Sequence, residues 1–276
     1  MPPLLFGTAG APTGSATNTT LDGVKRVSDL GLGCMEVEFV MGVRLKSREA
    51  ALIAQVAANR GIRLSVHAPY FINFNARESE KVRMSEIRLL QSARAAAQLG
   101  AKDVAFHAAF AMGDPPEKVY ESVKRSVSCV LEDMTKEGLQ VRLRPELMGK
   151  SSQFGALNEV LRLSSELPGV QPCIDFAHWH ARTGAFNSYP EFSTVLSQIR
   201  ERLGDAAIKD MHIHVAGIAY GKSGELKHLD LKDSDFAFRE LLQALRDARA
   251  GGLVICESPN QEQDALLLQR AYTEMR

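Results

Sequence analysis

Apolar positions in this chain fall into two alternating kinds of segment. Short continuous apolar runs, which are typical of buried strands, are separated by longer stretches in which apolar residues recur at helical spacing. Strands are expected over about residues 4–6, 34–39, 62–66, 103–106, 141–145, 170–174, 208–213 and 253–256. Helices are expected over about residues 20–30, 47–58, 77–99, 115–136, 155–166, 189–203, 235–248 and 264–274.

The order of these segments predicts one α/β domain over residues 1–276. Strands that alternate with helices pair in parallel, and eight strand–helix pairs predict a closed (β/α)8 TIM barrel. A doubly wound open sheet is the alternative, but the first expected strand lacks the GxGxxG turn of dinucleotide-binding sheets. No change in composition marks a linker or a second domain.

Six of the expected strands end in an acidic residue or a histidine, or are followed at once by one. These residues are His67, His107, Glu146, Asp175, His214 and Glu257. In an α/β barrel, the C-terminal ends of the strands meet at one rim, where active sites lie. The six side chains are therefore expected to converge on one site.

The histidines strengthen this expectation, because all seven lie near the C-terminal ends of expected strands or in the loops that follow, and none lies on an expected helix. They are His67, His107, His178, His180, His212, His214 and His228. A single histidine at a strand end is more often a hydrogen-bonded core residue, but seven together favour metal binding. Imidazole and carboxylate ligands suit zinc, manganese or iron(II) better than calcium.

The number of candidate ligands exceeds what one ion needs. One zinc ion takes three or four protein ligands, whereas the chain offers His67, His107, Glu146, Asp175, His178, His214, His228 and Glu257. Two or three ions that share a bridging carboxylate account for this number. Ions about 3.5–4 Å apart are typical of phosphoryl chemistry, since they bind both the attacking and the leaving oxygen.

Some of these residues could serve the fold rather than a metal. Asp175 could cap the helix that follows it, and either glutamate could form an ion pair with an arginine. His212 and His214 are two residues apart, so both face the same side of a regular strand. One of them suffices as a ligand, and His214 is favoured. His180 is expected to lie outside the metal site.

The bulk composition narrows the class of protein. The chain has 33 Lys plus Arg and 33 Asp plus Glu, so its net charge is zero and does not indicate nucleic-acid binding. The four cysteines are scattered, which predicts free thiols in a reducing compartment. No apolar run has the length of a membrane span, so we expect no membrane association and a cytoplasmic location. No apolar patch argues for a dimer, and a monomer is expected.

Several segments together resemble the endonuclease IV family of apurinic/apyrimidinic endonucleases, which sits in the wider xylose-isomerase-like barrel group. No single segment is specific, but the set follows the order of the family and spans nearly the whole chain. The segments are 65–70, 106–107, 144–146, 152–155, 173–178, 214–228 and 255–258.

The resemblance implies an enzyme that uses two or three zinc ions, with manganese as an alternative, to hydrolyse damaged double-stranded DNA 5′ of an abasic site. By that resemblance the ligands divide into three groups: His67, His107 and Glu146; Glu146 as a bridge with Asp175, His214 and Glu257; and His178 and His228 with an acidic residue. Glu146 would be the catalytic residue that orients the nucleophile, and Tyr70 would enter the DNA at the lesion. Among the basic residues near the rim, Lys150 and Arg44 are expected to help bind the phosphate backbone.

Two features depart from the family. The acidic partner of the third site usually lies two residues before its histidine, whereas Glu225 lies three residues before His228. The neutral charge balance is also less basic than a duplex-DNA enzyme would suggest. A sugar isomerase or epimerase of the same barrel group, which needs one ion held by two Glu, one Asp and one His, is therefore the alternative. The remaining histidines would then need a different role.

Overall fold

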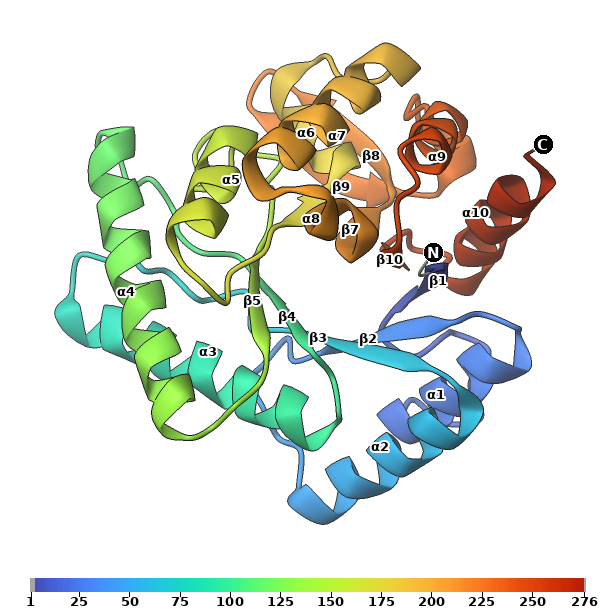
Figure 1. Cartoon of the computed structure of the whole chain (residues 1–276), viewed down its shortest axis with the longest axis horizontal. Helices are drawn as coiled ribbons and strands as arrows, with labels where there is room; N and C mark the ends of the chain where they lie inside the picture. The colour runs from blue at the N-terminus through green and yellow to red at the C-terminus, as the bar shows by residue number, and fades with distance from the viewer. Residues whose placement is uncertain (1–2, 276) are drawn as a thin grey trace.

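The predicted (β/α)8 barrel is confirmed by a computed structural model, which describes residues 3–275. Within them, eight parallel strands lie in the order β5-β4-β3-β2-β1-β10-β7-β6 around the barrel (Figure 1). The strands are β1 Leu4–Ala9, β2 Cys34–Glu38, β3 Arg63–His67, β4 Asp103–Phe106, β5 Arg142–Pro145, β6 Cys173–Asp175, β7 Met211–Val215 and β10 Gly252–Cys256.

The barrel closes where β5 and β6 meet, although these two strands share only isolated bridges. Leu143 pairs with Val170, and Glu146 pairs with Cys173, both in parallel. The amide of Leu147 also donates to the Cys173 carbonyl at 3.0 Å. Because Glu146 forms part of this closure, its backbone is fixed next to the start of β6 and near Asp175.

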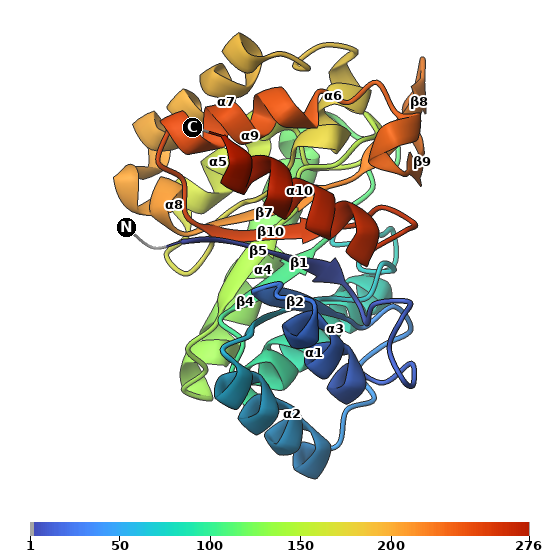
Figure 2. The same cartoon turned by 90° about the vertical axis from the view of Figure 1, so that its right-hand side faces the viewer.

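Helices cover the outside of the barrel (Figures 1 and 2). They are α1 Thr20–Asp29, α2 Ser47–Arg60, α3 Ser79–Gln98, α4 Pro116–Lys136, α5 Leu157–Glu166, α6 Phe176–Thr183, α7 Tyr189–Leu203, α8 Asp205–Lys209, α9 Phe238–Asp247 and α10 Glu262–Glu274, with a 3₁₀ helix at Leu231–Asp233. Pro116 begins α4 at a position that lacks an intrahelical partner for its amide in any case. Gly61, at φ +69°, ends α2 in the left-handed conformation that glycine adopts at little cost.

Three details differ from the expectations. The strand expected from residue 208 begins at Met211, because residues 205–209 form the short helix α8. The long loop expected after β7 is largely an antiparallel hairpin of β8, Gly217–Gly221, and β9, Gly224–Leu229. Figure 2 shows this hairpin at the end of the barrel toward which the strand arrows point. His178 and His180 were expected in a loop, but they lie on the short helix α6. The run from Phe176 to Thr183 was too short, and too close to β6, to stand out as a helix.

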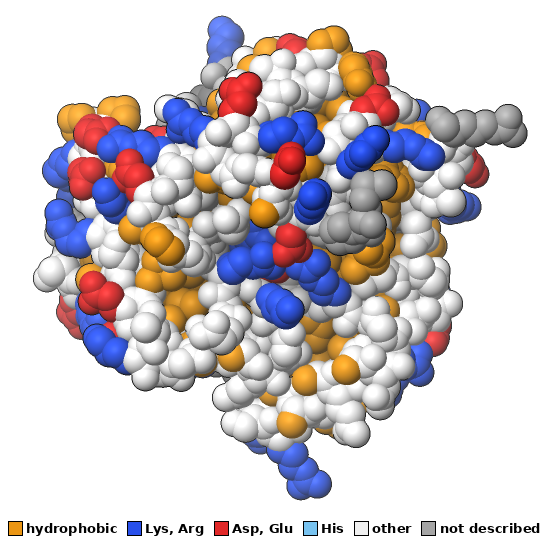
Figure 3. Space-filling view, viewed as in Figure 1, with side chains coloured by type: hydrophobic (Ala, Val, Ile, Leu, Met, Phe, Trp, Pro, Cys, Tyr) orange, Lys and Arg blue, Asp and Glu red, His pale blue; other side chains and the backbone are white. Residues whose placement is uncertain are grey.

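The opposite end of the barrel is closed by charges rather than by a metal cluster. Lys and Arg side chains gather around the middle of this face, where the strands begin (Figure 3). Arg63 and Arg142 each pair with both Asp103 and Asp210. Buried Arg144 donates from Nε to Asp103 Oδ1 at 2.7 Å. Burial alone would raise the pKa of Asp103, but Arg144 and other cationic neighbours hold it below its usual value.

All four cysteines are free, as the sequence predicted. Among residues 3–275, none of the helices combines the length and hydropathy that crossing a membrane requires. The functional site is therefore expected at the rim formed by the C-terminal ends of the strands.

Candidate metal centre

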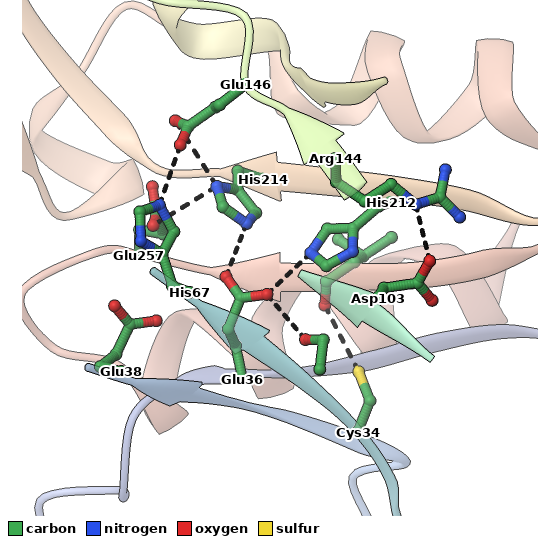
Figure 4. A network of polar contacts seen from close by, with 12 residues as sticks. Cys34, Glu36, Glu38, His67, Asp103, Arg144, Glu146, His212, His214 and Glu257 are labelled. Atoms are coloured by element: carbon green, nitrogen blue, oxygen red, sulfur yellow. Dashed lines mark hydrogen bonds and ion pairs between the residues drawn. The ribbon is translucent and has the colours of Figure 1, made fainter. Parts of the chain in front are cut away.

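Side chains from β3, β6, β7, β9 and α6, and from the residues just after β4, β5 and β10, converge inside the rim. Figure 4 shows four of them, His67, Glu146, His214 and Glu257. Among the described residues, four groups of possible ligands have all their ligand atoms within 4.8 Å of one another; one, Cys173, His212 and His214, lies deeper in the barrel, and three lie at the rim. The groups at the rim are His67, His107 and Glu146; Glu146, Asp175, His214 and Glu257; and Asp175, His178 and His228. The structure therefore brings together all eight residues that the sequence singled out as metal ligands.

Glu146 lies at the middle of these groups, and its two oxygens face different partners. Oε2 is 3.1 Å from His67 Nε2 and 3.0 Å from His107 Nε2. Oε1 is 3.1 Å from His178 Nδ1 and 3.6 Å from His214 Nδ1. Since Glu146 is 2% exposed, both oxygens point into the protein. One carboxylate therefore joins two sets of imidazoles, which is the arrangement of a bridging ligand.

The choice between the two histidines of β7 follows from their places along the strand. His214 Nδ1 lies 3.4 Å from Glu257 Oε1 and so belongs to the cluster. His212 lies one step deeper in the barrel, where its Nε2 contacts Glu36. His180 also lies apart, with Nδ1 2.8 Å from the Ala185 carbonyl. Both placements agree with the preference for His214 and with a site that leaves His180 out.

Asp175 caps a helix with one oxygen and leaves the other free to hold a metal ion. Its Oδ1 caps α6 by accepting from the His178 amide at 2.7 Å. Its Oδ2 is buried without a hydrogen-bond partner and lies 3.3 Å from His178 Nδ1. A buried carboxylate oxygen without a partner is costly, so a cation at this position would remove the cost.

The hairpin contributes His228 to the third group, and a β-bulge places Glu225 beside it. Ala219 pairs with Lys227 and Tyr220 pairs with Glu225, so Leu226 is an extra residue and is 67% exposed. In a regular strand, residues three apart face opposite sides, but the extra residue brings Glu225 to the side of His228. Glu225 Oε2 is 3.6 Å from His178 Nε2, and His228 Nε2 is 3.1 Å from the same nitrogen.

The buried histidines and carboxylates of the cluster shift one another's pKa values. Burial opposes the charged form of His67, yet Glu38 and Glu146 raise its pKa to about 10. Burial likewise opposes the charged form of His178, but Asp175 and Glu146 raise its pKa to about 10. Burial would raise the pKa of Glu146, but nearby histidines hold it well below its usual value. His67 and His178 thus hold protons against carboxylates in the metal-free protein, and metal ions would replace those protons.

The distances suit zinc or a similar ion. Ligand bonds of about 2.0–2.2 Å place two ligands of one ion about 3.0–3.6 Å apart. The contacts of Glu146 and Glu257 with imidazole nitrogens, from 3.0 to 3.6 Å, lie in this range. His178 Nε2 and His228 Nε2 lie 3.1 Å apart, which is also within this range.

The cluster opens into a cavity of about 220 Å³ lined by Tyr70, Lys150, Glu225 and several of the candidate ligands. The Tyr70 ring lies 5.2 Å from both the His67 and the His107 rings, and its hydroxyl is 3.4 Å from Glu38. Arg44 is exposed in the loop after β2. Tyr70 and Lys150 thus border the opening, whereas Arg44 lies in a rim loop outside the cavity lining.

Apolar side chains dominate the loops that follow the adjacent strands β2, β3 and β4, which the sequence did not lead us to expect. Exposed residues in these loops are Val40, Met41, Tyr70, Phe71, Phe110 and Met112. Together with the neutral net charge, they make this part of the rim less basic than a typical DNA-binding surface.

Sequence reasoning missed two carboxylates. Glu36 and Glu38 lie on β2, and both point toward the cluster from below (Figure 4). Burial raises the pKa of Glu38 to about 8. The signal was available, since two glutamates two residues apart in an otherwise apolar strand face one side together. Glu36 lies inside its strand, and Glu38 is followed by Phe39 in the expected strand 34–39, so neither stands at a predicted strand end.

Comparison with known proteins then places the chain. A family model described as Xylose isomerase-like TIM barrel matches residues 24–274. The chain belongs to this family. The chain is also 42% identical over 273 residues to an uncharacterized protein of Methanocaldococcus jannaschii, covering 99% of this chain and 98% of that protein.

Solved structures extend the similarity in two directions. Endonuclease IV from Thermus thermophilus is 19% identical, with a TM-score of 0.76 over 98% of this chain and 97% of that one. A D-tagatose 3-epimerase-like protein is 15% identical, also with a TM-score of 0.76, over 98% of this chain and 96% of that one. The resemblance to endonuclease IV is thereby confirmed. At these identities the likeness establishes the fold that the xylose isomerase-like family shares, and the reaction must be argued from the site.

Proposed function

We propose that this protein is a divalent-metal phosphodiesterase that cleaves DNA on the 5′ side of abasic sites, with zinc as the expected metal and manganese as an alternative. The observation that supports this proposal most strongly is that the two carboxylate oxygens of Glu146 face two separate sets of imidazoles. A carboxylate shared in this way suits two or more neighbouring ions. Bound ions would supply the positive charge and the activated water that phosphodiester hydrolysis needs.

The protein's own residues would have distinct tasks. Glu146 would keep the ions at a fixed spacing and, through them, orient the attacking water. Tyr70 stands at the opening of the cavity with an exposed ring, where it could stack on a base or fill the space left by a missing one. Lys150 lines the same cavity and would contact a phosphate. The exposed apolar side chains of the neighbouring loops would pack against bases that a lesion leaves unstacked.

A sugar isomerase or epimerase is the second candidate, and one observation favours it. Glu146, Asp175, His214 and Glu257 form by themselves the two-Glu, one-Asp, one-His set that one ion needs. This reading leaves the contacts of His67 and His107 with Glu146 Oε2 without a purpose. It also leaves His178 and His228 facing each other at 3.1 Å. We therefore favour the nuclease.

The test is incision of a labelled duplex that carries one synthetic abasic site, in the presence of zinc or manganese. We expect a single cut 5′ of the site by the wild type and none by Glu257→Ala, which removes one ligand from the cluster. His180→Asn serves as a matched control, because His180 is a buried rim histidine outside the cluster. Intact DNA after incubation with the metal-loaded wild type would refute the proposal, and conversion of ketoses would then support the isomerase.

A further inference from the structure

Two of the candidate ligand histidines are held from behind by backbone carbonyls. Nδ1 of His67 lies 2.7 Å from the Ala68 carbonyl, and Nδ1 of His228 lies 3.2 Å from that of Glu257. In each of these two rings a proton on Nδ1 would satisfy the carbonyl, and Nε2 would be left to face the cluster. The fold itself therefore orients these rings.

His214 is turned the other way. Its Nδ1 faces Glu257 and Glu146, and its Nε2 lies 2.8 Å from Glu36 Oε1. The group behind this ring is therefore a carboxylate and not a carbonyl. Figure 4 shows Glu36 rising from β2 between the two imidazoles of β7.

Glu36 is held in this position from several directions. Its Oε2 lies 2.8 Å from His212 Nε2 and accepts from the Ser65 hydroxyl at 2.7 Å. The side chain is fully buried. Two imidazoles and one hydroxyl therefore converge on this single buried carboxylate. A charged group without access to water is expensive, and one that only filled space could be apolar.

We propose that Glu36 is a positioning residue that fixes His214 with its proton on Nε2 and its Nδ1 free for metal. A carboxylate behind a ligand imidazole fixes the tautomer and the ring orientation and makes the free nitrogen a stronger donor. The consequence is specific to one place: Glu36 strengthens metal binding by the group of Glu146, Asp175, His214 and Glu257. The group of His67, His107 and Glu146 does not contain His214 and gains nothing from it.

This inference rests on the metal centre that the proposed function requires, and it does not depend on the substrate. A purely structural role for Glu36 makes a different forecast. Loss of its charge would then lower the stability of the barrel, while the affinity of a folded variant for metal would stay the same. Metal affinity is thus the property that separates the positioning role from the structural one.

The experiment is a zinc titration of Glu36→Gln against a competing chelator, with folding checked by circular dichroism. Gln keeps the size of the side chain but removes its charge. We expect one ion to bind about 10–100-fold more weakly, while the other ions keep their wild-type affinity. Ser126→Ala is the matched control, because it removes a buried hydroxyl that donates to a carboxylate, Glu86, on the outer helices, and it should bind every ion as the wild type does. Wild-type affinity at every site in Glu36→Gln would overturn the inference.

A second measurement needs no variant at Glu36. In the zinc-loaded wild type labelled with ¹⁵N-histidine, long-range nitrogen–proton spectra report which ring nitrogen carries the proton. We expect the proton on Nε2 in His214 and on Nδ1 in His67 and His228. A proton on Nδ1 of His214 would overturn the inference. A weakened ion in Glu36→Gln, together with a wild type that incises no abasic DNA, would support this inference and count against the proposed function.

Discussion

Replacement of Glu146 by Gln removes a charge while it keeps the shape of the side chain. In the structure this carboxylate contacts four imidazoles at 3.0 to 3.6 Å and is almost completely buried. Removal of one partner from a buried charge pair costs about 3–5 kcal/mol, because the other charge is left uncompensated. At about 1.4 kcal/mol per factor of ten, metal affinity should fall by roughly two to three and a half orders of magnitude.

The assay combines two readouts on the same protein. The metal content of Glu146→Gln is measured after dialysis against a weak chelator, and incision of an abasic duplex is measured with excess metal. Glu166→Gln is the control, since it removes a carboxylate that contacts Tyr120 and Lys124 away from the rim. Wild-type metal content and incision in Glu146→Gln would refute the view that Glu146 joins the ions.

Four further predictions follow from other parts of the structure. Glu225→Gln should lower the number of bound ions by one, because it weakens the group of His178 and His228; native mass spectrometry of a variant that keeps every ion would contradict this. Tyr70→Ala should weaken binding of a lesion duplex by about 1–3 kcal/mol, the range for loss of one stacked base, with little change in the rate at saturation; unchanged affinity in a binding titration would make Tyr70 a packing residue. Arg144→Met should cost about 3–5 kcal/mol of unfolding free energy, because Asp103 loses a buried partner; a urea midpoint at the wild-type value would count against this. His67 and His178 have a pKa of about 10 in the folded protein against 6.5 as the ordinary value. They therefore stabilise the metal-free protein fully below about pH 6.5, and this stabilisation should fall as the pH rises toward 10. If urea unfolding in the presence of a chelator showed stability rising over this pH range, the interaction of these histidines with the carboxylates would be contradicted.

The barrel was predictable because its signals are local. Each apolar run and each helical stretch depends on neighbouring residues, and their alternation leaves few topologies. The convergence of His67, Glu146 and Asp175 was also predictable, since a parallel barrel brings the ends of its strands to one rim. This prediction required only that the end of each strand be located in the sequence.

Features that depend on contacts between distant elements were harder to predict. Glu36 lies inside a strand, and its purpose becomes visible only when β7 brings His212 and His214 against it. The position of Glu225 beside His178 depends on a bulge in a hairpin that looked like a loop. The apolar rim loops were missed because a single exposed Met or Phe carries no signal until three adjacent strands place several together.

The most direct test of the central claim is a crystal structure of the zinc-loaded protein with anomalous diffraction at the zinc edge. We predict two or three ions, with Glu146 bound to one ion through Oε2 and to another through Oε1. A single ion held by Glu146, Asp175, His214 and Glu257, with His67 and His107 making no contact to metal, would contradict the account and favour a one-ion isomerase.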